Sequence, residues 1–172
     1  MDFLQLAADR YSVRRFQPRH LEQEVVEKLL QAAHLAPTGC NYQPQRLLVL
    51  NTDSSIAKLK GCTKCHFDAP TAILVCYNKQ ECWRRRYDGK SCGVSDACIV
   101  ATHIMLEAAS IGVGSTWVMH FDPAAMRSIF AIPEEVEPVA LLTLGYPAED
   151  AEPNPLHSSF RPMDEVVRYD HF

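Results

Sequence analysis

Short apolar runs, separated by segments of helical periodicity, most strongly limit what this chain can fold into. The runs RLLVL (46–50), TAILVCY (71–77) and PVALLTLGY (138–146) have the length and character of buried strands. GVGSTWVMHF (112–121) passes from a loop into a further strand. Because helical segments alternate with these strands, the sequence predicts a layered domain of the α/β or α+β class.

The segments between the strands carry helix signals. Helices are predicted over residues 2–10, 22–35, 53–60, 95–111 and 122–130. The longest, 95–111, is apolar nearly all round, which indicates a central position. Asp122 suits an N-cap and Pro123 the first helical position after it, whereas Asp53 is expected to begin the helix at 53–60.

Length and charge narrow the class of protein further. The 172 residues suit one domain, expected to cover 1–172. The net charge of -4 argues against a broad nucleic-acid-binding face. No apolar run approaches the ~20 residues needed to span a bilayer. MDFLQLAADRYSVRRF lacks the apolar centre of a signal peptide, so we expect a cytoplasmic chain with neither nucleic-acid nor membrane partners.

The C-terminal tail is unusual. Residues 151–172 are rich in proline and then only weakly ordered around MDEVV. The segment AEPNPLHSSFRP cannot form a regular packed element of its own domain. The tail is therefore either a disordered end or a segment that lies along another surface, such as a partner subunit.

The motif CTKCH (62–66) matches the pattern that attaches c-type haem. Haem attachment takes place outside the cytoplasm, which disfavours this interpretation for a chain without an export signal. A closed zinc or iron–sulfur site usually needs a second close pair of ligands, and the other cysteines form no second Cys-x-x-Cys. A metal or haem protein built on Cys62, Cys65 and His66 is kept as the least favoured alternative.

Two polar motifs have the chemistry of a binding site. Arg10, Ser12 and Arg14 alternate, so in an extended segment they share one side and form a phosphate-type site; the alternative is a solvated basic turn. Asn41 and Gln43 also alternate, and their amides suit a ring edge that has both donors and acceptors; the alternative is hydrogen bonding within the loop.

Two further motifs are less specific. In GVGSTWVMHF the glycines allow a close backbone approach, but the order of a Rossmann fingerprint or a P-loop is absent. The segment WRRRYDGK (83–90) is either a solvated basic loop or a docking point for the phosphate of a nicotinamide cofactor.

In this order the motifs resemble the nitroreductase family of FMN-dependent oxidoreductases, in its compact branch. RYSVRRF, APTGCNYQPQRLLVL, SDACIVATHIMLEAASIGVGSTWV, PVALLTLGYPAE and FRPMDEVV match family segments along nearly the whole chain. The resemblance implies an α+β nitroreductase-like fold with a mainly antiparallel central sheet flanked by helices. It also implies an intertwined homodimer, in which residues of about 151–172 form an arm that wraps the partner.

The resemblance implies roles for individual residues. The cofactor-binding set is Arg10, Tyr11, Ser12, Arg14, Pro37, Thr38, Asn41, Gln43, Cys62, Trp117, Val118, Met119, His120 and Arg161. Arg10, Ser12 and Arg161 are expected at the FMN phosphate and ribityl chain, with Arg14 near flavin N1/O2. The loop residues from Pro37 to Gln43 are expected at the partner's flavin, and residues 117–120 along the ring. Cys62 or Thr63 takes the place of a family residue at the pyrimidine edge, and His120 replaces a common glycine.

The expected activity is that of an FMN-dependent NAD(P)H oxidoreductase acting on nitroaromatics, quinones or related small oxidised acceptors. Either NADH or NADPH serves as the transient reductant, and ping-pong hydride transfer through flavin N5 is implied. The protein supplies orientation and charge and no side-chain acid or base, because the cofactor carries the redox chemistry. The alternative is a flavin-binding or flavin-sequestering protein without turnover.

Overall fold

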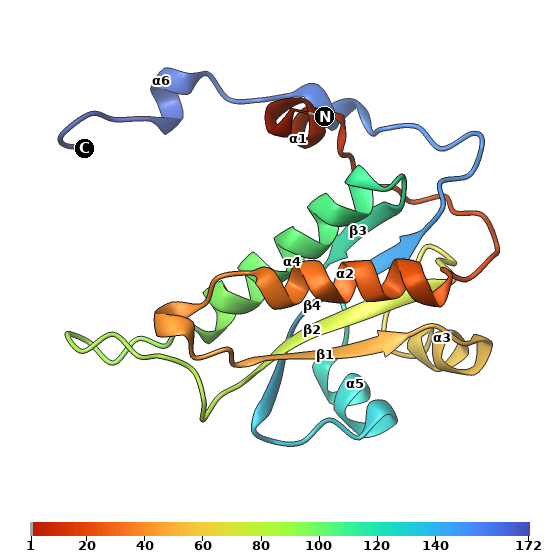
Figure 1. The fold of residues 1–172 in the computed structure, drawn as a ribbon, viewed down its shortest axis with the longest axis horizontal. Helices are drawn as coiled ribbons and strands as arrows, with labels where there is room; N and C mark the ends of the chain where they lie inside the picture. The colour runs from red at the N-terminus through yellow and green to blue at the C-terminus, as the bar shows by residue number, and fades with distance from the viewer. Residues whose placement is uncertain (1) are drawn as a thin grey trace.

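One antiparallel sheet organises the chain (Figure 1). The computed structural model describes residues 2–172. Its strands are β1 (Gln45–Leu50), β2 (Thr71–Asn78), β3 (Gly114–Val118) and β4 (Val136–Gly145), arranged in the order β1-β2-β4-β3. Every neighbouring pair is antiparallel, so the expectation of an α+β fold with a mainly antiparallel sheet is confirmed.

Helices cover both faces of this sheet. The helices of the described chain are α1 (Phe3–Asp9), α2 (Gln23–Leu35), α3 (Asp53–Leu59), α4 (Gly93–Ser110), α5 (Pro123–Phe130) and the short α6 (Met163–Val166). Two 3-10 turns, Gly39–Asn41 (η1) and Pro155–Ser158 (η2), follow α2 and precede α6. Helices α2 and α4 pack on one face of the sheet, and α3 and α5 pack on the other. The five predicted helices are confirmed with small shifts at their ends.

The helix caps are only partly as expected. Asp122 caps α5, accepting hydrogen bonds from the amides of Ala124 and Ala125 at 2.8 and 3.1 Å. Helix α3 begins at Asp53 as predicted, but its N-cap is Thr52, which exchanges hydrogen bonds with Ser55. The reciprocal pairing satisfies orphan backbone N–H groups at the start of the helix.

Strand β2 is buried along its whole length and divides the core in two. Ile73, Val75 and Tyr77 face the helices α2 and α4, whereas Leu74 and Cys76 face α3 and α5. This alternation is the period of two expected of a strand with both faces covered. No helix among residues 2–172 is both long and apolar enough to cross a membrane.

The segment after α1 lies along the free edge of β3. The amide of Val13 donates to the carbonyl of Ser115 at 3.0 Å, and the hydroxyl of Thr116 donates to the carbonyl of Val13. Ser12 and Ser115 form an isolated parallel bridge. A side chain at Gly114 could not be accommodated, because its Cβ would lie 2.7 Å from Cγ2 of Val13.

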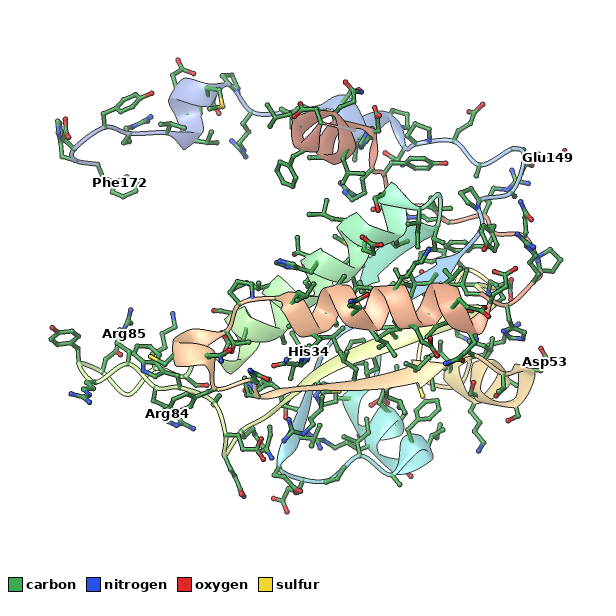
Figure 2. The ribbon with its side chains drawn as sticks, in the orientation of Figure 1. His34, Asp53, Arg84, Arg85, Glu149 and Phe172 are labelled. Carbon is green, nitrogen blue, oxygen red and sulfur yellow. The ribbon has the colours of Figure 1, made fainter. Side chains whose placement is uncertain are left out.

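The C-terminal arm, residues 151–172, runs away from the sheet (Figure 1), and Phe172 at its tip lies far from the body (Figure 2). The arm is held at its start, where Tyr11 donates to the carbonyl of Ala151 at 3.2 Å and the His157 ring contacts the carbonyl of Ala8 at 3.0 Å. Beyond these contacts its large apolar side chains, such as Phe160, are exposed. The chain therefore extends an apolar segment that its own body does not cover.

We predict that Gly93→Ala destabilises the fold. A Cβ at residue 93 would lie 2.1 Å from Cε2 of Tyr77, so α4 could no longer approach β2. Overpacking of this kind costs about 1–3 kcal/mol, measurable as a lower midpoint in denaturant unfolding. Gly61→Ala is the matched control, because the atom nearest to a Cβ at residue 61, the carbonyl oxygen of Lys58, would lie 3.3 Å from it. Equal midpoints for the two variants would contradict the close approach.

Candidate active site

The edge of β3 exposes a guanidinium that no acid neutralises. Because Val13 is buried against the core, Ser12 and Arg14 project from the opposite side of the extended segment. Cζ of Arg14 lies 5.8 Å from the ring centroid of Phe67, and its NH1 donates to the carbonyl of Ser12 at 3.3 Å. Within residues 2–172 no carboxylate forms an ion pair with Arg14. This side chain is available to an anionic ligand.

Arg10 and Tyr11 line a neighbouring cavity of about 180 Å³. Its walls come from α1, the end of α4 and the start of β3. Thus Ser12 and Arg14 share one side as predicted, whereas Arg10 lies at the end of α1 and reaches the cavity beside it. The hydroxyl of Tyr11 is already engaged with Ala151, so Tyr11 also ties the arm to this region.

Two loops meet beside the Arg14 region. The hydroxyl of Thr63 donates to the carbonyl of His120 at 2.5 Å, and the carbonyl of Cys62 accepts from the amide of Asp122 at 2.8 Å. Residues 60–64 and 120–122 together line a cavity of about 410 Å³. Both lysines of the first loop, Lys60 and Lys64, line it, and Lys60 is paired with an aspartate.

The residues predicted along the cofactor ring differ in exposure. Met119 is 62% exposed and His120 is exposed, whereas Trp117 is partly buried. Val118 is buried and packs in the core beside α3 and α5, so its predicted contact with the ring would involve its backbone. The structure thus leaves the end of this segment, after β3, open to a ligand.

The CTKCH motif separates into different environments. Cys62 is 3% exposed, and its thiol lies in the core, 3.8 Å from the carbonyl oxygen of Lys58. Burial, and secondarily the charge of Asp122, raise the pKa of this thiol. His66 Nδ1 accepts from the amide of Asp68 at 3.0 Å. No group of three or more metal-binding side chains occurs in the described chain, so the motif forms no ligand set there. Contact between Cys62 and a flavin stays a prediction.

The loop from Pro37 to Gln43 has a constrained backbone. Cys40, Asn41 and Gln43 have φ values of 49°, 56° and 51°, a region that L-residues adopt only under local constraint. The amide of Gln43 donates to the hydroxyl of Thr38 at 3.0 Å, and the Gln43 side chain donates to Oδ1 of Asn41 at 3.1 Å. Both side chains are exposed. Hydrogen bonding within the loop is therefore present, and the outer edges of the amides face solvent.

Asp96 anchors this loop, and the motifs in the sequence did not single it out. It is 2% exposed on α4, and its Oδ1 accepts from the amide of Gly39 at 2.9 Å. Its Oδ2 accepts from the thiol of Cys92 at 3.1 Å. Burial, reinforced by this carboxylate, raises the pKa of Cys92 to about 11, so the thiol keeps its proton at neutral pH. An acid in the first turn of a mostly apolar helix was the signal that could have identified Asp96.

One protomer does not gather all the predicted residues. The loop follows the end of α2, whereas the Arg10–Arg14 segment lies across the molecule beside β3 (Figure 1). Arg161 is on the arm just before α6, exposed and 3.4 Å from Glu165. A site that uses all of these residues requires a second chain, and their joint role stays a prediction.

We predict that Asp96→Ala loosens the loop and destabilises the protein. The partly buried amide of Gly39 would lose its acceptor, which costs about 1–3 kcal/mol. Asp96→Asn keeps an oxygen for that amide and should lose less stability. Denaturant unfolding of both variants tests this, and an equal loss would mean that the hydrogen bond to Gly39 is not the source of the effect.

The comparisons with known proteins identify the family of the chain. The family model described as the Nitroreductase family matches residues 7–65 and 57–146. A crystal structure of a nitroreductase family protein from Clostridium difficile 630 is 41% identical, with a TM-score of 0.94 over 100% of both chains. A nitroreductase from Desulfovibrio desulfuricans, solved in complex with FMN, is 26% identical with a TM-score of 0.82, covering 98% of this chain and 96% of that one.

A curated relative from Methanothermobacter thermautotrophicus bears the name NADH dehydrogenase/NAD(P)H nitroreductase. It is 31% identical over 160 residues, which are 87% of this chain and 80% of the relative. Together with the match of the family model, this confirms the resemblance of the ordered motifs. The chain belongs to the nitroreductase family of oxidoreductases.

Proposed function

We propose that the chain is an FMN-dependent NAD(P)H oxidoreductase that reduces nitroaromatics, quinones or related small acceptors. The observation that carries the proposal is the unneutralised guanidinium of Arg14, fixed beside Ser12 on the edge of β3. A cation in this position suits a cofactor that becomes anionic on reduction. FMN in the Desulfovibrio relative and the NAD(P)H in the name of the Methanothermobacter relative support the choice of cofactor and reductant.

The residues present fit FMN chemically. Ser12 and Arg14 offer a hydroxyl and a cation on one side of an extended segment, and Arg10 lies close to them in the sequence. The cavity bounded by Thr63 and His120 adds polar groups. In this proposal Arg10, Ser12 and Arg161 bind the phosphate and ribityl chain, and residues 117–120 lie along the ring.

The chain's own contribution to the reaction is electrostatic and positional. FMN, when bound, supplies hydride acceptance and donation at N5, in ping-pong alternation between reductant and acceptor. Arg14 places positive charge where anionic charge collects. Asn41 and Gln43 orient a ring edge through their exposed amides, and the buried anchor at Asp96 keeps that loop in place.

The proposed enzyme is a homodimer. Helix α4 was predicted to be apolar nearly all round, and its outer face leaves Val94 51% and Ile99 37% exposed. The arm adds further exposed apolar residues, such as Phe160 at 83%. A second copy would cover both surfaces and bring its own Pro37–Gln43 loop to the Arg14 region, which would complete the split site.

The direct test is the spectrum and turnover of purified protein. We expect flavin absorbance that is released as FMN on denaturation, and oxidation of NADH or NADPH that depends on menadione or nitrofurazone. Folded protein that neither contains nor binds FMN would refute the proposal. FMN binding without any reductant oxidation would instead indicate a flavin-binding protein that lacks turnover.

We predict that Arg14→Ala slows reduction of the bound flavin roughly tenfold to a hundredfold, because a positioned charge is removed from the reacting centre. Stopped-flow absorbance measures the rate. Arg15→Ala is the matched control: Arg15 is the neighbouring residue but forms an ion pair with Asp150 at 2.5 Å. Similar losses in both variants would mean that the rate does not depend on the position of Arg14.

We also predict that Ile99→Glu shifts the protein from dimer to monomer, because a carboxylate on the outer face of α4 would be buried unpaired in the interface. Sedimentation analysis measures the mass against the 19.4 kDa of one chain. Ala57→Glu, at an exposed position on α3, should leave the mass unchanged. A wild-type protein that sediments as a monomer would overturn the dimer.

A further inference from the structure

Residues 82–92 form a basic ribbon that begins in the core at Cys82 and projects from it. Arg84 and Ser91 form an antiparallel bridge, and the amide of Arg85 donates to the carbonyl of Lys90 at 3.0 Å. The ribbon turns at Gly89, whose φ of 71° favours glycine. It projects beside η1 (Figure 1), and Figure 2 shows Arg84 and Arg85 on it.

The charge of this ribbon is concentrated and mostly unneutralised. Its cations are Arg84, Arg85, Arg86 and Lys90, in a chain whose net charge is -4. Asp88 is its single acid and pairs with Arg85, whose Nε donates to Oδ1 at 2.9 Å. In the described chain neither Arg86 nor Lys90 forms a salt bridge. Like charges held this close repel one another, which suits a surface that takes up an anion.

The base of the ribbon is packed onto the loop assigned to the flavin. A Cβ at Gly39 would lie 2.6 Å from Sγ of Cys92 and 3.2 Å from Cβ of Trp83. Asp96 binds Gly39 and Cys92 at the same time. The ribbon therefore holds a fixed position relative to that loop. From Trp83 to Tyr87 an extended segment reaches about 13 Å, at a strand rise of about 3.3 Å per residue.

The tip adds an aromatic surface. Tyr87 is 97% exposed between Arg86 and Asp88. An exposed tyrosine beside arginines matches a ligand that carries both an aromatic base and phosphate groups, because rings stack on its face and Arg binds phosphate bidentately. Nitroaromatic and quinone acceptors are small and carry no phosphate. Of the two proposed substrates, only the reductant has this chemistry at a distance from its reacting ring.

We propose that the arginine ribbon binds the adenosine 2′-phosphate end of NADPH and makes this enzyme prefer NADPH to NADH. The inference rests on the proposed function, since it places the nicotinamide end at the flavin. NADPH and NADH differ only in the 2′-phosphate. The preference for NADPH over NADH therefore measures how much the ribbon contributes to binding that phosphate. Arg84 and Arg86, which are not committed to Asp88, are the phosphate-binding residues.

The test compares steady-state kinetics of wild type and the Arg84→Ala/Arg86→Ala double variant. We expect wild type to favour NADPH, and the variant to raise KM for NADPH about tenfold, the effect of losing charge-assisted hydrogen bonds worth about 1.4 kcal/mol. KM for NADH and kcat should change less than about twofold on the same grounds. Lys28→Ala/Lys58→Ala removes two exposed charges from α2 and α3 and is the matched control. It should behave as wild type.

A binding measurement separates this inference from the proposed function. Calorimetry with 2′,5′-ADP should show binding to wild type, weakening as NaCl is raised, and about tenfold weaker binding to the double variant. Absence of 2′,5′-ADP binding, or equal changes in KM for NADPH and NADH, would overturn the role of the ribbon even if flavin-dependent turnover is intact. Protein without FMN that still binds 2′,5′-ADP through these arginines would refute the proposed function and keep the phosphate site.

Discussion

The proposed site depends on the two hydrogen bonds that the buried carboxylate of Asp96 accepts. A buried carboxylate is costly unless hydrogen bonds replace its hydration. One carboxylate oxygen of Asp96 accepts a hydrogen bond from the amide of Gly39, and the other accepts one from the thiol of Cys92. Because the raised pKa of Cys92 keeps its proton in place, the thiol remains a donor at neutral pH. Helix α4, the proposed flavin-facing loop and the arginine ribbon are thereby joined at one buried point.

This junction gives the loop its uncommon backbone. Residues with positive φ other than glycine persist only where surrounding contacts hold them, and the contacts at Thr38 and Gly39 do so. The loop presents its amides to solvent rather than to its own protomer. In the same way the arm presents Phe160 and Phe172 to solvent. Both are understandable if each is built to meet a second chain, which is the arrangement proposed for the enzyme.

Local patterns were enough to predict the helices and strands, because these elements are regular, whereas the antiparallel sheet was implied by the resemblance to the nitroreductase family. The two-residue alternation of β2, the apolar spacing of α2 and the Asp122–Pro123 start of α5 are all encoded by neighbours in the sequence. The contacts of the site are not. Arg14 lies over Phe67, and Asp96 binds Gly39 57 residues away; neither pairing leaves a local signal. The ribbon over 82–92 was predicted only as a loop, because its cross-strand bonds join residues without strand-like alternation.

The motif CTKCH shows how a short pattern acquires its meaning from burial. Cys62 and Cys65 pack against the core beside α3 and α5, while Thr63, which follows Cys62, makes the polar contacts. Its hydroxyl accepts from the amide of Cys65 at 2.9 Å and donates to the carbonyl of His120. Thr63 therefore joins the loop before β2 to the segment after β3, and these two segments are the walls of the cavity of about 410 Å³. The cysteines fix this loop to the core, and Thr63, itself only 7% exposed, positions it, so at this point the loop serves the shape of the proposed flavin site.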